Sequence, residues 1–333
     1  MKAFRTLLIL LAGLAAASFG QPCSSNNATD VVYHFPNVAN LGTLERRIGD
    51  RPGAVALDRI SSRRHKVAAA EGVVKLSEAE NRGVYFAPGL ALIRHPELMD
   101  AISPDNIQGF LFSFTSTGDS EDALADGLVA KIFHLKNLRL LRLSRCDVSD
   151  LGAKGIHDLP QLKTLDLSYS LISNKSVPVI GKLTGLEELI LNNVDLAKSD
   201  FSYIGGLPKL SALYLRNSQV NDTMVNALKP AKSLSVLDLT NNTAITDASL
   251  PALALLPNLK TVSFSGTSVN VRSLIKLSRV TSVVVSRREL KGASLAVLCK
   301  TIPNLVLDIR DKQGGLGNSP GAEEMHLFAP TRF

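Results

Sequence analysis

The chain has 333 residues, of which 45% are hydrophobic and 5% aromatic, and it contains no Trp. This content is sufficient for a sizeable core that aliphatic side chains must fill. The three cysteines, Cys23, Cys146 and Cys299, exclude a complete internal disulfide framework, so stability must come from burial. The formal charge of +7 is a mild surplus, which solubility explains as well as an anionic partner does.

The first 20 residues are typical of a secretory signal. Lys2 and Arg5 provide the positive charge, residues 7–17 form an apolar stretch, and Ser18-Phe19-Gly20 offers a small-x-small cleavage site. The apolar stretch is roughly half of the ~20 residues that a membrane-spanning helix needs. We therefore expect an exported protein that is secreted or located in the periplasm or cell envelope.

Cys23 follows the signal closely and allows two interpretations. One is plain cleavage, and the other is lipid attachment, because this is where the lipidated cysteine of a bacterial lipoprotein often stands. Pro22 occupies a position where such a signal has a small residue. The sequence therefore favours plain cleavage and leaves Cys23 as an alternative tether or a site for pairing with another chain.

Residues 30–105 show no repeat and predict a small N-terminal capping module. Short strands are expected at residues 73–76 and 84–93. A helical turn is expected at residues 96–102, ending at Ser103-Pro104. Residues 107–135 resemble an irregular first repeat with a longer insert, since Phe110, Phe112 and Phe114 alternate there.

A short leucine pattern then recurs through most of the remaining chain. Leucines stand at the first, fourth and sixth positions of the first five copies, as in LKTLDL from Leu162 and LEELIL from Leu186, and the later copies are more degenerate. Four successive spacings are 24 residues and the later ones are 25, 21 and 25. The copies begin at Leu138, Leu162, Leu186, Leu210, Leu234, Leu259, Val280 and Leu305.

The two halves of each repeat have different periods. The fourth and sixth positions alternate, which indicates a short strand with one buried face. Positions 16, 19 and 22 are apolar at intervals of three, which suits a short helix or a 3₁₀ segment. One repeat cannot bury both faces alone, so neighbouring repeats must stack and share a core.

The repeated L-x-x-L-x-L phrase followed by a polar turn resembles the leucine-rich repeat family. The copy at residues 244–264 is similar to bacterial and cysteine-containing variants of that family. The resemblance implies an α/β solenoid, a horseshoe with a parallel sheet on its concave face and short helical or 3₁₀ segments on its convex face. It also implies a protein partner more often than any other.

The predicted organisation is a signal (1–20), a capping module (30–105), a solenoid (106–310) and a disordered tail (311–333). Asp308 falls where a leucine would be buried, and a charge there is expected to stop further strand addition. The tail is rich in Gly and Pro.

The sequence offers no constellation for catalysis. The histidines stand in no HExxH or Cys-x-x-Cys metal pattern, and neither a G-x-S-x-G elbow nor a phosphate-binding Gly loop occurs. We predict no enzyme activity, no cofactor and no metal site.

Binding is the remaining function, and the variable strand residues are the candidates for it. Side chains between the leucines point to the sheet face opposite the core. Tyr and Arg, which occur among them, are enriched at the hot spots of protein interfaces. A solvated sheet face would carry a similar mixture by chance. The candidate partner-binding residues are Arg142, Asp166, Tyr169, Glu188, Ile190, Tyr214, Arg216 and Asp238.

A basic segment suggests a second class of partner. Residues 271–300 contain seven Lys or Arg against a single Glu, with Arg287 and Arg288 adjacent. Such a surface suits an anionic polysaccharide or a phospholipid membrane surface. Nucleic acid is disfavoured by secretion and by the lack of interleaved aromatic residues. The alternative function is therefore a structural or adhesive envelope component, held by Cys23 or by basic patches such as this segment.

Overall fold

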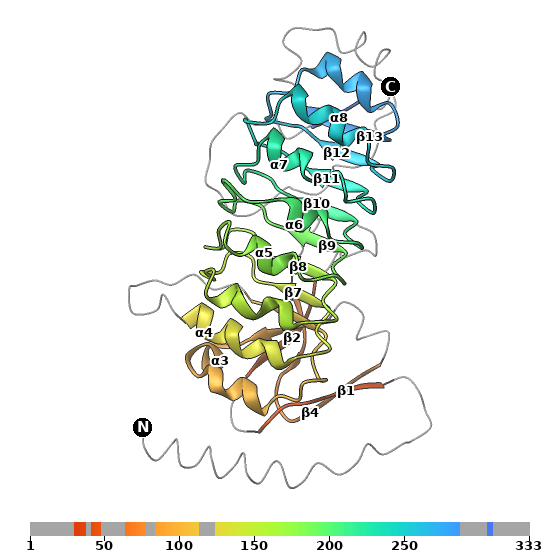
Figure 1. Ribbon diagram of the computed structural model, residues 1–333. Helices are drawn as coiled ribbons and strands as arrows, with labels where there is room; N and C mark the ends of the chain where they lie inside the picture. Colours follow the sequence, from red (N-terminus) through yellow and green to blue (C-terminus); the bar gives the residue numbers. More distant parts are fainter. Residues whose placement is uncertain are drawn as a thin grey trace.

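The computed structural model describes residues 30–37, 41–47, 64–77, 84–112, 124–286 and 305–308. The elements follow one another along a single elongated body, from β1 (Asp30–His34) and β4 (Val73–Ser77) at one end to α8 (Leu250–Leu253) and β13 (Ser282–Ser286) at the other (Figure 1). The Cys23 terminus, the Arg287-Arg288 pair and the predicted tail lie outside the described residues.

Twelve of the described strands form one sheet, in the order β14-β13-β12-β11-β10-β9-β8-β7-β6-β5-β2-β3. Neighbours are parallel from β5 to β14. This arrangement confirms the predicted α/β solenoid with a parallel sheet. The strands of the repeats are β7 (Leu140–Arg142), β8 (Thr164–Asp166), β9 (Glu188–Ile190), β10 (Ala212–Tyr214), β11 (Val236–Asp238), β12 (Thr261–Ser263), β13 and β14 (Leu305–Asp308).

Short helical segments cover the other side of each repeat. Both α-helical and 3₁₀ turns occur, as the three-residue spacing of apolar side chains predicts. They are α4 (Leu124–Lys131), η3 (Ile132–His134), η4 (Gly152–Asp158), α5 (Val177–Ile180), α6 (Ser202–Gly205), α7 (Asp222–Asn226), η5 (Asp247–Ser249), α8 and η6 (Val271–Leu277).

The N-terminal residues extend the repeat sheet. Strand β5 (Val84–Pro88) pairs with β6 (Gly109–Leu111), and β2 (Gly42–Arg47) lies antiparallel between β5 and β3 (Arg64–Ala69). Strands β1 and β4 pair separately. The strand predicted for residues 84–93 ends early, because residues 90–94 form helix α3 (Leu90–Arg94). The predicted helical turn is present as η2 (Pro96–Ala101).

One continuous core runs through the array. The leucines at the fourth repeat position are at most 1% exposed, and the isoleucine or leucine at position 19 is fully buried in four successive repeats. Cys146 is also fully buried in the turn after β7. The core extends to Leu44 and Phe86 of the N-terminal strands, so these strands share it with the repeats.

Aspartates link successive repeats on the helical side of the molecule. Asp150 accepts hydrogen bonds from Ser173 N at 2.8 Å, Ser173 Oγ at 2.6 Å and Ser176 Oγ at 2.5 Å in the next repeat. The same link recurs between other pairs, namely Asp126 with Ser149, Asp222 with Thr246 and Asp247 with Asn270 and Ser273. At the two junctions between these pairs, the aspartate position holds Asn174 and Lys198.

Replacing Asp150 with alanine is expected to lower the free energy of unfolding by about 1–2 kcal/mol, because a backbone amide and two hydroxyls lose their acceptor. Asp195→Ala is the control and should cost less, since within the described part of the chain Asp195 accepts only the local Ala197 amide. Equilibrium denaturation measures both. Equal losses for the two variants would contradict a role for the inter-repeat link.

The effect of Asp150→Ala should depend on pH. Burial raises the pKa of Asp150, but hydrogen bonds from Ser173 and Ser176 outweigh it and hold the pKa below its usual value. A carboxyl with a depressed folded-state pKa stabilises the fold fully above its unfolded pKa of about 3.9. That stabilisation is lost as the pH falls through the folded pKa, so wild type and variant should converge in acid.

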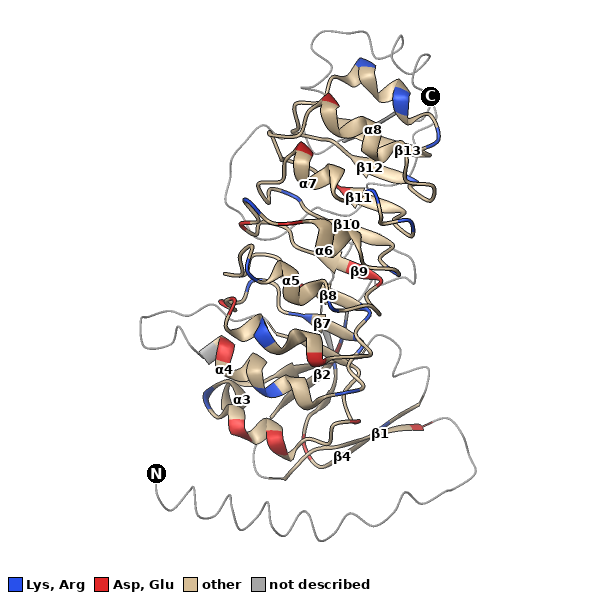
Figure 2. Ribbon diagram, viewed as in Figure 1, with Lys and Arg blue, Asp and Glu red and all other residues tan. Residues whose placement is uncertain are grey.

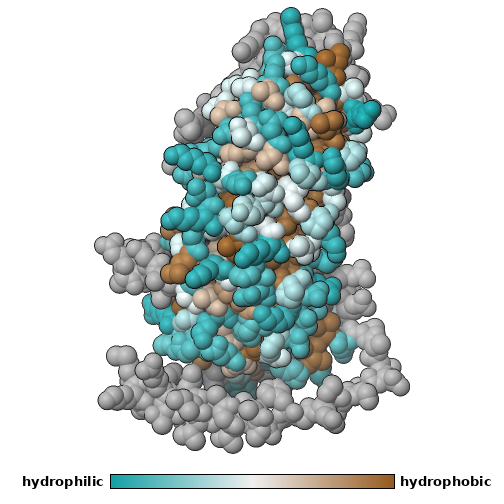
Figure 3. All heavy atoms as spheres, viewed as in Figure 1, coloured by the Kyte–Doolittle hydropathy of each residue, from teal (hydrophilic) through white to brown (hydrophobic). Residues whose placement is uncertain are grey.

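No helix in the described part of the chain is long and apolar enough to cross a membrane. Acidic and basic residues are interspersed along the array (Figure 2). The side seen in Figure 3 is largely hydrophilic, with separate hydrophobic spots.

Candidate functional site

The strand register brings the predicted binding residues into one row across the sheet. Arg142 pairs with Asp166, Asp166 with Ile190, Ile190 with Tyr214, and Tyr214 with Asp238. Glu188 lies in the adjacent row, where Thr164 Oγ1 donates to Glu188 Oε2 at 3.3 Å. Successive side chains are therefore separated by the spacing between strands, about 4.8 Å. We call these two rows the outer sheet face.

The outer sheet face is more buried than its alternating pattern predicts. Tyr214 and Arg142 are 1% exposed and Asp238 is 2% exposed. Ile190 and Tyr214 form a small apolar cluster, separate from the core, against which Ala212 and Val236 pack. Apolar side chains thus occupy both faces of the sheet at β9 to β11.

Among the predicted binding residues, Tyr169 is exposed. It belongs to a column of equivalent residues that follow the strands of successive repeats. The eighth residue of six successive repeats has a positive φ, between 51° and 74°. The Arg145 guanidinium lies 4.6 Å from the centre of the Tyr169 ring, a cation–π contact. Asn217 Nδ2 donates to Asn193 Oδ1 at 2.8 Å. We call Arg145, Tyr169, Asn193, Asn217, Asn241 and Gly266 the strand-end column.

Residue type explains the positive φ of most residues in this column. Asn and Gly adopt positive φ at low cost, whereas Arg145 and Tyr169 do so less readily. Tyr169 is 45% exposed. Both strained positions therefore adjoin the outer sheet face and present an aromatic ring and a cation together.

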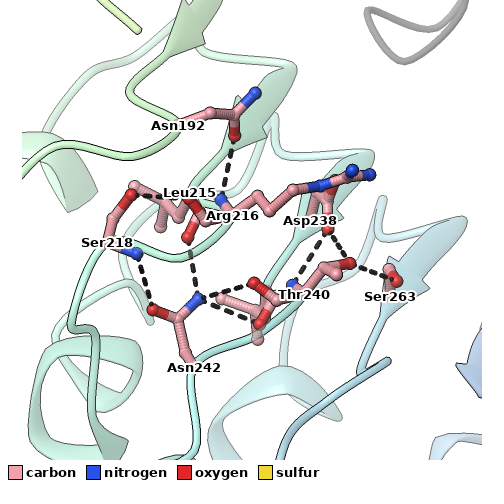
Figure 4. Close-up of polar contacts among 9 residues, drawn as sticks. Asn192, Leu215, Arg216, Ser218, Asp238, Thr240, Asn242 and Ser263 are labelled. Atoms are coloured by element: carbon pink, nitrogen blue, oxygen red, sulfur yellow. Dashed lines mark hydrogen bonds and ion pairs between the residues drawn. The ribbon is translucent and has the colours of Figure 1, made fainter. Parts of the chain in front are cut away.

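Arg216 and Asp238 form an ion pair beside the apolar cluster (Figure 4). Arg216 Nη2 lies 3.7 Å from Asp238 Oδ2, which is longer than the 2.7–2.9 Å of a charge-assisted hydrogen bond. Thr240 N donates to Asp238 Oδ1 at 3.0 Å, and Thr240 Oγ1 donates to the same atom at 2.5 Å. Ser263 Oγ lies 2.8 Å from Thr240 Oγ1.

Asn242 secures the turn below this pair (Figure 4). Its Oδ1 accepts from Ser218 N and Val220 N, both at 3.0 Å. Its Nδ2 donates to three carbonyls, those of Leu215 at 2.7 Å, Leu239 at 2.9 Å and Thr240 at 3.3 Å. The backbone that carries Arg216 is thereby attached to the next repeat.

Sequence reasoning did not include Thr240 and Ser263 among the binding candidates, although a signal for Thr240 was present. Residues two apart on a strand share a face, so Asp238 and Thr240 in Asp-Leu-Thr are neighbours. Asp166 and Ser168 repeat the arrangement, with Ser168 N donating to Asp166 Oδ1 at 3.0 Å. Among the described residues, no group of three His, Cys, Asp or Glu side chains is placed to hold a metal ion.

The leucine-rich repeat family model matches residues 134–156 and 231–254. These matches fall on the same repeats that stack in register in the sheet. The chain contains leucine-rich repeats. No curated protein matches it.

Solved structures of other leucine-rich repeat proteins are similar in part. An internalin from Listeria monocytogenes has a TM-score of 0.41 and 15% identity, over 59% of this chain and 64% of that one. A leucine-rich repeat protein from Leptospira interrogans has a TM-score of 0.41 and 16% identity, over 60% of this chain and 52% of that one. The leucine-rich repeat chain described here thus spans less than two thirds of either structure.

Proposed function

We propose that this leucine-rich repeat protein is an exported, non-enzymatic scaffold that binds another protein through its outer sheet face and strand-end column. Export is supported by the charged and apolar pattern of residues 1–20. Leucine-rich repeat proteins generally act as scaffolds for protein interaction.

The observation that carries the proposal is the exposed Tyr169 ring with the Arg145 guanidinium over it, beside the second apolar cluster. Ile190 and Tyr214 pack with Ala212 and Val236 on the sheet face opposite the main hydrophobic core. Arg216 and Asp238 flank this cluster, and Tyr169 with Arg145 stands at the strand ends. Apolar and aromatic residues with adjacent Arg are the composition of interface centres.

The experiment is affinity capture by the immobilised mature protein. The Tyr169→Ala/Arg216→Ala variant is expected to retain on the order of a tenth or less of the protein partner that wild type captures. The matched control is Tyr203→Ala/Arg272→Ala, which removes an exposed Tyr and an exposed Arg from the helical side. Equal capture by wild type and Tyr169→Ala/Arg216→Ala, with both folded, would rule out this surface.

A further inference from the structure

Exposed basic residues follow the edge of the sheet at which the repeat strands begin. In each of the seven repeats that start between residues 138 and 280, we consider the segment from four residues before the first repeat position to one residue after it. Every one of these start segments contains at least one Lys or Arg, and all of these side chains are exposed. We call them the strand-start row: Lys136, Arg139, Lys163, Lys182, Lys209, Lys232, Lys260, Lys276 and Arg279.

The recurrence of basic residues does not come from copying one repeat position. Lys163 directly follows the first leucine of its repeat, Lys209 directly precedes it, and Lys182 stands four residues before it. The long, flexible side chain of Lys allows charges from these different positions to reach a common line. The strand-start row is therefore a property of the assembled surface, separate from the leucine pattern.

Acidic side chains leave most of the strand-start row uncompensated. The start segments hold only Asp158 and Glu187. Lys163 Nζ lies 2.8 Å from Glu187 Oε1, an exposed ion pair. The other eight members of the row form no ion pair in the described part of the chain. From Lys209 to Arg279 the start segments contain no acidic residue at all.

The aspartates of the repeats lie elsewhere, where the helical segments begin. Asp222 and Asp247 are the first residues of α7 and η5, and Asp150 shortly precedes η4. Their carboxylates accept hydrogen bonds from the next repeat. The strand-start row lies at the other end of these segments, where each helical turn gives way to a strand. Both signs of charge thus occur along the array, but they separate across it.

Hydrogen bonds between neighbouring repeats fix the spacing of the strand-start row. Lys163 N donates to Arg139 O at 2.9 Å, and the equivalent backbone bond recurs in the following repeats. Asn258 Nδ2 donates to Lys232 O at 2.8 Å, which ties the backbone of one member to the next repeat. Successive charges therefore advance by the spacing between strands, about 4.8 Å.

We propose that the strand-start row binds a linear polysaccharide that carries one anionic group on each sugar, an interaction separate from the proposed protein binding. A sugar residue lengthens such a polymer by about the same distance as one repeat lengthens the array. Each repeat then places at least one cation beside one anion. The individual attractions between exposed charges are weak, but they add along the chain because the polymer is held at many points.

Two other anionic partners suit the row less well. A phospholipid surface spreads its charge over an area, whereas the strand-start row is a line with one or two cations per repeat. Single-stranded nucleic acid is held by stacking on aromatic side chains as well as by charge. No Phe or Tyr stands in the start segments.

The test measures the binding of galacturonate oligosaccharides of increasing length to the full-length protein by isothermal titration calorimetry. Affinity should rise until the oligosaccharide spans the repeats, and it should fall as salt screens the exposed charges. The methyl esters of the same oligosaccharides lose the charge and should not bind. Tyr169→Ala/Arg216→Ala should bind the oligosaccharides like wild type, so this proposal and the proposed protein binding can fail separately. Binding of the esters, no binding of the acids, or tighter binding of phosphatidylglycerol vesicles or single-stranded DNA would overturn the proposal.

Lys209→Glu/Lys232→Glu locates the binding to the row. Both side chains are exposed and form no ion pair in the described residues, so the variant should fold. Its affinity for the longest oligosaccharide should fall on the order of tenfold, because reversing two charges replaces attraction with repulsion. The matched control, Lys154→Glu/Lys198→Glu, makes the same change of net charge at exposed positions away from the row and should bind like wild type. Thermal melts verify folding, and equal weakening in the two folded variants would overturn the proposal.

Discussion

Replacing Asn242 with alanine is expected to lower the free energy of unfolding by about 3–5 kcal/mol. The change removes one amide that joins two repeats. It leaves the Ser218 and Val220 amides without their acceptor and the Leu215 carbonyl without its side-chain donor. The Leu239 and Thr240 carbonyls lose the side-chain bond but keep backbone donors, namely Asn242 N and Asn217 N. Because Asn242 is 2% exposed, water cannot replace these bonds without disturbing the turn.

Asn241→Gly is the matched control. Asn241 is the neighbouring asparagine, but it is exposed and has a φ of 61° that glycine adopts freely. Its replacement should change the unfolding free energy by less than about 1 kcal/mol. Equilibrium denaturation followed by circular dichroism compares the two. A loss for Asn242→Ala no larger than that for Asn241→Gly would contradict the role assigned to the buried amide.

The same position illustrates what repeat spacing can predict. The ninth residue varies through Cys146, Ser170, Val194, Ser218, Asn242 and Thr267. Two of the hydroxyls return to a nearby carbonyl, with Ser170 Oγ on Leu167 O and Thr267 Oγ1 on Phe264 O, both at 2.7 Å. Ser218 Oγ donates across repeats to Leu191 O at 2.6 Å, which is a single bond. Asn242 has an acceptor and two donors, so it bonds several backbone groups of two repeats at once. Residue chemistry at one position thus distinguishes repeats that the leucine pattern treats alike.

Leucine periodicity predicted the sheet because each repeat can bury its leucines only by stacking in register on the neighbouring repeats. It also placed the outer row correctly, since register follows from the spacing of the copies. It did not predict that Tyr214 and Asp238 are buried, because alternation assigns a face and carries no information about what packs on that face. Whether the eight candidate residues bind a partner stays a prediction.

Helix α3 shows a different limit. Val84 to Ile93 is apolar almost throughout, and a run of that kind suits a strand or a buried helix equally. Pro88-Gly89 divides the run, so β5 ends at Pro88 and α3 begins after Gly89. The division was readable from these two residues, which commonly end strands.

The aspartate links were hidden by their sequence separation. Asp150 and Ser173 are 23 residues apart and become neighbours only because the repeats stack. At the two central junctions Asn174 and Lys198 replace the aspartate, so other contacts must hold the repeats together there. One such contact is the close approach between the backbones of neighbouring repeats, which a glycine at the contact makes possible.

Gly205→Ala is therefore expected to destabilise the protein by about 2–3 kcal/mol. A Cβ at Gly205 would lie 2.4 Å from the Ala227 carbonyl oxygen and 3.3 Å from Leu228 Cα in the next repeat. Both atoms are backbone, so the repeats would have to move apart. Alanine gains about 1 kcal/mol over glycine in a helix, which is too small to offset this overlap.

Gly206→Ala separates the overlap from the general effect of removing a glycine. Gly206 is exposed, and a Cβ there would lie 3.3 Å from Ser202 O and 3.7 Å from Tyr203 O, both in the preceding turn of the same segment. Its replacement should be neutral or stabilising by up to about 1 kcal/mol. Chemical denaturation should therefore show a lower midpoint for Gly205→Ala and an unchanged or higher midpoint for Gly206→Ala. Similar midpoints for Gly205→Ala and Gly206→Ala would show that the close approach of α6 to Ala227 does not hold these repeats together.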